Sequence, residues 1–118
     1  MPVCLKSAYA EPDRSDGLRI LVDRLWPRGV SKDRLKIDAW LKELAPSDEL
    51  RRWFGHDPEK WEEFRRRYFL ELVAREAPVA ELRDKILNGR VTLIFAARDQ
   101  RHNNAVALRD FLERQMAP

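Results

Sequence analysis

The sequence predicts an α/β fold in which a small, largely parallel or mixed β-sheet is flanked by helices in a Rossmann-like arrangement. Its 118 residues match the length of one domain, and no linker or repeat divides the span 1–118. Three short apolar segments have the composition of strands, whereas the long stretch between the second and the third has helical spacing. Because adjacent parallel strands need a crossover connection, this helical stretch is expected to join two strands of one sheet.

Strands are predicted over Val3–Tyr9, Leu18–Asp23 and Val91–Ala96. Turn-forming and charged residues separate the first two segments. The third segment follows Asn88-Gly89, is too short for a helix and is rich in β-branched and aromatic residues, which is typical of a strand buried on both faces. The single cysteine, Cys4, lies in the first segment and is predicted to be a buried strand residue rather than a reactive thiol.

Helices are predicted from N-cap residues, apolar spacing and glycine stops. Ser47 and Asp57 are candidate N-caps, and Pro58 suits the first helical position. The segment 38–44 fits either a helix or a short strand that would extend the sheet, so both readings stay open. The expected helices span 32–36, 48–54, 58–72, 78–87 and about 100–115, and the third carries an apolar stripe of Trp61, Phe64, Tyr68 and Leu72.

The composition is that of a globular protein with a nearly balanced charge. Hydrophobic residues make up 44%, charged residues 36%, and the formal net charge is +3, so the bulk charge does not require a nucleic-acid partner. No apolar run has the length of a signal peptide or a membrane span, which predicts a protein with no membrane association. One cysteine permits no intramolecular disulfide, which suits a cytoplasmic location.

Polar side chains follow two of the predicted strands. Ligands of open α/β sheets bind beyond the carboxyl ends of the strands. If the second and third predicted strands are parallel neighbours, their polar tails lie side by side and form one site. The tail of the second strand holds Asp23, Arg24, Trp26, Arg28 and Gly29, and the tail of the third holds Arg98, Asp99, His102 and Asn103.

The chemistry of these side chains favours an anion. Arg24, Arg28 and Arg98 offer bidentate contacts to phosphate or carboxylate, and Trp26 offers a wall for a ring. The expected helix start after Asp99 attracts negative charge as well. His102 beside Asp99 has the composition of a general acid–base pair. The sequence therefore predicts a site for a nucleotide or phosphorylated metabolite, and it leaves open whether that molecule is only bound or is hydrolysed or transferred.

Structural roles compete with each of these assignments. Asp99 also suits an N-cap, Asp23 an ion pair with Arg24 or Arg28, Trp26 the core, and His102 a hydrogen bond to a backbone carbonyl. His56 and the run 65–67 are expected on the solvated surface. The arginine-rich surface also admits a non-enzymatic nucleic-acid or protein-binding module, or a scaffold for a dimer. No metal-ligand spacing, phosphate loop, dinucleotide fingerprint or nucleophile elbow identifies a cofactor.

Three motifs resemble the YeaO-like family of small bacterial proteins, which is classed as a domain of unknown function. They are Asp23–Gly29, Trp40–Ser47, and Ala96–Asp99 with His102-Asn103, in the same order and over nearly the whole chain. The resemblance implies an α/β domain of this size in the bacterial cytoplasm and supplies no established activity. Longer members of the broader family carry a cysteine–histidine pair near His102-Asn103, and this chain has no cysteine there.

Overall fold

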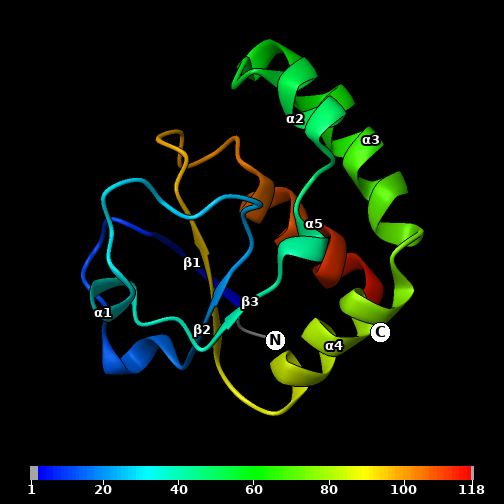
Figure 1. The fold of residues 1–118 in the computed structure, drawn as a ribbon. Helices are drawn as coiled ribbons and strands as arrows, with labels where there is room; N and C mark the ends of the chain where they lie inside the picture. The colour runs from blue at the N-terminus through cyan, green and yellow to red at the C-terminus, as the bar shows by residue number, and fades with distance from the viewer. Residues whose placement is uncertain (1–2, 118) are drawn as a thin grey trace.

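A computed structural model describes residues 3–117 of the protein and has a four-stranded, fully parallel sheet at its centre (Figure 1). The strand order is β1-β4-β2-β3. The register places Val3 beside Val91 and Leu18 beside Val91, so β4 lies between β1 and β2. The strands are β1 (Val3–Ser7), β2 (Leu18–Leu21), β3 (Ala39–Trp40) and β4 (Val91–Phe95).

Most of the remaining chain is helical, and the α/β class predicted from the sequence is confirmed. Three longer helices carry most of this content, and the others are short. Among the helices of residues 3–117, none combines the length and the apolarity that crossing a membrane requires. The α-helices are α1 (Lys32–Leu35), α2 (Asp48–Phe54), α3 (Trp61–Val73), α4 (Glu76–Leu87) and α5 (Asn104–Met116), and the 3-10 helices are η1 (Arg14–Asp16), η2 (Lys42–Leu44) and η3 (Pro58–Lys60).

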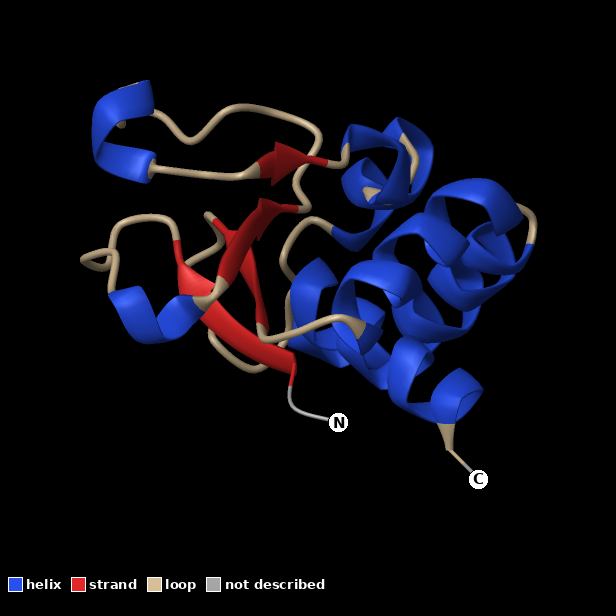
Figure 2. Ribbon diagram, turned by 90° about the horizontal axis from the view of Figure 1, so that it is seen from below, coloured by secondary structure: helices blue, strands red, loops and turns tan. Residues whose placement is uncertain are grey.

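The two faces of the sheet are covered differently, as Figure 2 shows. Along β4, the alternating residues Val91, Leu93 and Phe95 join the main core with α2, α3, α4 and α5. Ile94 faces the other way, into a smaller cluster with Leu35 of α1. The longer helices therefore cover one face, while the connection between β2 and β3, residues 22–38 with α1, covers much of the other.

The apolar stripe predicted for the third helix is confirmed and forms the centre of the main core. Phe64, Tyr68 and Leu72 of α3 are buried, and Phe54 of α2 stacks on Phe64 with ring centroids 4.3 Å apart. The Tyr68 hydroxyl donates a hydrogen bond to the carbonyl of Leu44. A buried phenol needs such a partner, and this one ties η2 to α3.

Several boundaries differ from those predicted. Strands β1 and β2 each end two residues early, and the open segment 38–44 contains both a two-residue strand and the 3-10 helix η2. Helix α4 begins at Glu76 rather than Pro78, because a proline is tolerated within the first turn of a helix. Cys4 is half-buried rather than buried, since β1 is an edge strand.

The start of α5 is the largest correction. The helix begins at Asn104, and Asn103 is its N-cap, accepting a hydrogen bond from the backbone N–H of Val106 at 3.0 Å. Asp99 does not cap this helix. Its carboxylate accepts the backbone N–H groups of Arg101 and His102 instead, which holds the preceding segment as a loop.

Candidate ligand-binding cavity

A cavity of about 360 Å³ lies at the carboxyl ends of β2 and β4. This is the edge of the sheet at which a site was predicted, and the volume suits a small molecule. The charged and titratable side chains of its lining are Asp23, Arg24, Arg28, Arg51, His56 and Tyr9. The rest of the lining consists of Leu25, Trp26, Pro27, Ala45, Pro46, Phe54, Phe64, Ala96, Ala97, Asn103 and Asn104.

The loop after β2 supplies one wall of the cavity, and its shape has local causes. The backbone N–H of Val30 donates to the carbonyl of Pro27, and Gly29 has φ +80°, which together define a type II turn. Gly29 is not in the lining, but it sets this turn and so places Arg28 at the outer tip of the loop. The Tyr9 hydroxyl donates to the carbonyl of Arg28 at 3.1 Å and fixes that tip.

Trp26 packs in the core, one of the two roles that the sequence left open, and its place in the cavity lining agrees with the other. Its ring N–H donates to the carbonyl of Val30 at 2.5 Å, and its ring meets Trp40 edge to face at 5.5 Å. Trp40 in turn donates to the carbonyl of Asp23 at 2.7 Å. Trp26 therefore packs with the smaller core cluster and also lines the cavity.

Asp23 follows β2 and links it to the end of the neighbouring strand β4. One carboxylate oxygen accepts the backbone N–H of Ala96 at 2.9 Å, and the other accepts the side-chain amide of Asn104 at 3.1 Å. Burial raises the pKa of Asp23 above its usual range, and these two hydrogen bonds offset only part of that effect. The ion pair considered with Arg24 or Arg28 is not found among residues 3–117.

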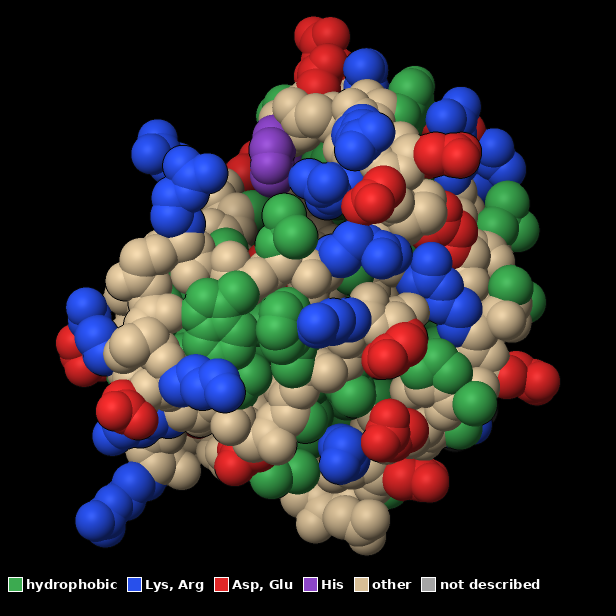
Figure 3. Space-filling view, viewed as in Figure 1, with side chains coloured by type: hydrophobic (Ala, Val, Ile, Leu, Met, Phe, Trp, Pro, Cys, Tyr) green, Lys and Arg blue, Asp and Glu red, His purple; other side chains and the backbone are tan. Residues whose placement is uncertain are grey.

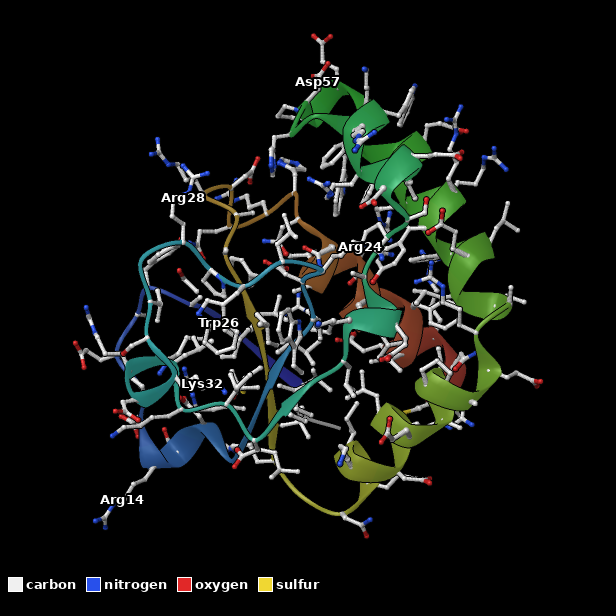
Figure 4. All side chains as sticks on the ribbon, in the orientation of Figure 1. Arg14, Arg24, Trp26, Arg28, Lys32 and Asp57 are labelled. Carbon is white, nitrogen blue, oxygen red and sulfur yellow. The ribbon has the colours of Figure 1, made fainter. Side chains whose placement is uncertain are left out.

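Arg24 and Arg28 stand at opposite ends of the loop, with Trp26 between them (Figure 4). Arg24 extends towards the start of α2 and donates to the carbonyl of Pro46, which precedes that helix, at 3.4 Å. Its Nε lies 3.4 Å from a carboxylate oxygen of Asp48 but is buried and makes no hydrogen bond within residues 3–117. Arg51 contacts the same carboxylate at 3.5 Å, so two arginines of the lining share one acid. The lining thus carries an excess of positive charge.

The loop after β4 contributes less to the cavity than predicted. Arg98, Asp99 and His102 are outside the lining, although Asn103 belongs to it. The Asp99–His102 pair does form, with a carboxylate oxygen 3.0 Å from Nδ1, and the ring of His102 packs edge to face on Trp61 at 5.3 Å. Hydrogen bonds from the backbone of Arg101 and the side chain of His102 lower the pKa of Asp99. The cleft expected between Arg28 and Arg98 is therefore not this cavity.

Comparison with known proteins places the chain in a family. Residues 2–118 match the model of DUF488-N3i, described as the inactive DUF488-N3 subclade. The chain belongs to this family. It is 40% identical to the uncharacterized protein YeaO of Escherichia coli strain K12 over 112 residues, which cover 95% of this chain and 97% of the relative. No solved structure gives a significant match.

Two mycobacterial relatives are also named as uncharacterized proteins. They are Mb3100c of Mycobacterium bovis and Rv3073c of Mycobacterium tuberculosis, each 42% identical over 104 residues, or 88% of this chain and 87% of the relative. The resemblance to YeaO-like proteins is thus confirmed. The names of these relatives state no activity.

In this DUF488-N3i member, sequence reasoning missed the part of the cavity that α2 supplies. Arg51 and Phe54 lie on α2, and His56 follows it (Figure 1). His56 is exposed, as predicted, but it lines the cavity and has φ +57° directly after Gly55 at φ +54°. No local pattern marks these residues, because the packing of α2 against α3, where Phe54 stacks on Phe64, brings them beside the strand ends (Figure 1).

The arginine run 65–67 is largely neutralised by its own neighbours. Arg65 lies 3.2 Å from Asp110, while Arg66 and Arg67 lie 2.7 and 2.8 Å from Glu63. Hydrogen bonds from Arg66 and Arg67 lower the pKa of Glu63 to about 2. Figure 3 shows basic and acidic side chains interspersed over α2 and α3. This face is therefore a mixed-charge surface rather than a continuous basic stripe.

Proposed function

We propose that this protein binds a small anionic molecule, such as a nucleotide or phosphorylated metabolite, in the cavity at the ends of β2 and β4. The observation that carries the proposal is the lining, which contains three arginines and His56 but a single carboxylate, Asp23. Guanidinium groups form strong, directional hydrogen bonds to phosphate and carboxylate. We assign the anion to Arg24, Arg28 and Arg51. We also propose a cytoplasmic location, which is consistent with a nucleotide or phosphorylated metabolite as the ligand.

Apolar rings give the same cavity a place for a ring-bearing ligand. Trp26 lines one side, and Phe54 and Phe64 line another part of the wall. Ligand sites commonly combine such apolar walls with a few fixed polar groups. The Nε of Arg24 is buried and lies 3.4 Å from a carboxylate oxygen of Asp48, so this acid holds one side of the guanidinium group in place.

The proposal is binding without catalysis. The matching family model is described as an inactive subclade. Within residues 3–117, the lining contains no Ser, Thr, Cys or Lys, and its possible nucleophiles are Asp23, His56 and Tyr9, of which Asp23 and Tyr9 are engaged in hydrogen bonds within the protein. The Asp99–His102 pair, considered as an acid–base pair from the sequence, is outside the lining, so we give it the structural role of holding the loop before α5.

Arg28→Ala is expected to weaken ligand binding by about ten- to a hundredfold, because one charge-assisted contact is worth roughly 1.5–3 kcal/mol. A thermal-shift panel of nucleoside monophosphates and sugar phosphates first identifies the strongest binder, and calorimetry then gives its Kd. Arg98→Ala is the matched control, since Arg98 is exposed and outside the lining. Its Kd should stay within about twofold of wild type. Equal losses in the two variants, or no binder in the panel, would contradict the proposal.

A nucleic-acid module receives less support, because the arginines of 65–67 are paired with acids. Such a module would bind DNA or RNA with an affinity that falls steeply as salt increases. A gel-shift series from low to physiological salt separates the two functions, and we expect no salt-dependent complex.

A further inference from the structure

Asp23 is the feature of the cavity that anion binding alone does not explain. A carboxylate repels an anion, yet Asp23 lies in the lining among the basic side chains. Burial raises its pKa, so its ionised form is incompletely compensated. Within residues 3–117 no cationic side chain lies within 4.0 Å of it in an ion pair.

The carboxylate of Asp23 accepts two hydrogen bonds and can accept further ones. Ala96 donates to one oxygen and Asn104 to the other. An ionised carboxylate has about four acceptor positions, so about two remain. The amide of Asn104 also donates to the carbonyl of Val22 at 3.0 Å, which anchors this arrangement to the end of β2. Asp23 is therefore a fixed acceptor rather than a mobile surface acid.

We propose that Asp23 determines specificity by selecting, among anionic ligands, those that also carry an N–H or O–H donor. This inference rests on the proposed function. The ligand is then bipolar, with its anionic group on Arg24, Arg28 and Arg51 and its donor on Asp23. Amino- and hydroxyl-bearing phosphates belong to this class. A ligand that lacks the donor desolvates the remaining acceptor positions of Asp23 without supplying a hydrogen bond to them, which lowers the affinity of that ligand.

Three phosphates that share the anionic group test this selection. Ethyl phosphate has no donor beyond the phosphate, 2-hydroxyethyl phosphate has a hydroxyl, and 2-aminoethyl phosphate has an ammonium group. NMR titration measures the Kd of each with the wild-type protein. We expect the hydroxyl and ammonium compounds to bind about fivefold or more tighter than ethyl phosphate, which corresponds to one hydrogen bond of roughly 1 kcal/mol or more.

Asp23→Asn should reduce that preference to below about twofold. Loss of the negative charge should leave the affinity for ethyl phosphate unchanged or increase it, a gain that an unfolded or loosened variant could not show. Asp33→Asn is the matched control, because Asp33 is an exposed acid on α1 outside this cavity. It should retain the wild-type preference.

The possible results separate the two proposals. If wild type binds all three phosphates equally, or if D23N keeps the wild-type preference, the role of Asp23 is overturned while anion binding stands. If D23N only lowers Tm at an unchanged preference, Asp23 is structural. If wild type binds none of the three and none of the larger anions in the panel, both proposals fail. If D23N does not fold, the wild-type series alone decides, because equal affinities overturn the inference.

Discussion

Tyr68→Ala is expected to destabilise the protein by about 3–5 kcal/mol, the range for removing a large aromatic side chain from a packed core. The Tyr68 side chain is 0% exposed, packs against Phe64 at 5.7 Å and donates to the carbonyl of Leu44. Replacement leaves both a cavity and an unpaired buried carbonyl. Urea unfolding followed by circular dichroism measures the change.

Tyr68→Phe is the control for this prediction. It keeps the ring and removes only the hydroxyl, so the loss should be about 1–3 kcal/mol. A Tyr68→Ala loss below about 1 kcal/mol would show that the core around α3 is not packed as described.

The end of α3 and the residue Arg75 that precedes α4 also position the cavity. Glu71 accepts the backbone N–H and the hydroxyl of Ser47 at 2.8 and 2.6 Å. Arg75 donates to the carbonyl of Ala45 at 2.5 Å and also to that of Glu43. These contacts fix the segment that brings Ala45 and Pro46 into the lining. Loss of Tyr68 should therefore weaken ligand binding as well as stability.

Arg19→Ala is the second large effect, with an expected loss of about 3–5 kcal/mol at neutral pH, as found when one partner of a buried ion pair is removed. Arg19 is buried and donates to the carboxylate of Asp16 and to the carbonyl of Leu35, each at 2.7 Å. Without it, Asp16 keeps Lys6, at 2.9 Å, as its one ion-pair partner among residues 3–117, and the Leu35 carbonyl loses its charged donor.

The pH dependence of this loss follows from the pKa of Asp16. Burial tends to raise that pKa, but hydrogen bonds from Lys6, the Asp13 backbone and Arg19 together lower it. A lowered pKa in the folded state stabilises the protein above the unfolded value of about 3.9, and this contribution is lost as pH falls through the folded value. In Arg19→Ala, one of the hydrogen bonds that offset the effect of burial is lost, so the pKa of Asp16 should be higher than in the wild type.

The difference in unfolding free energy between wild type and Arg19→Ala should therefore shrink as pH falls below about 4. Urea unfolding at a series of pH values from neutral to acid measures this difference. Lys6→Ala is the comparison, because the side chain of Lys6 is partly exposed and its loss should be smaller. A difference that is constant with pH, or that increases in acid, would contradict the assigned role of the buried pair.

The sequence predicted the sheet and the edge at which the cavity lies, because those features depend on local patterns. The apolar run 91–95 became the central strand β4, and the tails of β2 and β4 meet where Ala96 donates to Asp23. The stripe on α3 was predicted for the same reason, since helical spacing reports which face is buried.

The remaining features depend on contacts that no local pattern reveals. Asp99 satisfies two backbone N–H groups of its own loop, so α5 starts later than the composition suggested and the Asp99–His102 pair is not in the cavity lining. Arg51 and His56 reach the cavity because α2 packs against α3, which holds them beside the carboxyl ends of the strands. The positive φ of His56 was not predicted either, because no sequence pattern at that position indicates it.

Mapping a bound nucleotide by NMR tests the central claim most directly. Uniformly 15N-labelled protein is titrated with adenosine 5′-monophosphate, and backbone amide shifts are followed to saturation. We expect saturable changes to concentrate in 23–28, 51–56, 96–97 and 103–104, the segments that line the cavity. The absence of saturable changes, or changes centred on the mixed-charge face at 65–67, would contradict an anion site at the ends of β2 and β4.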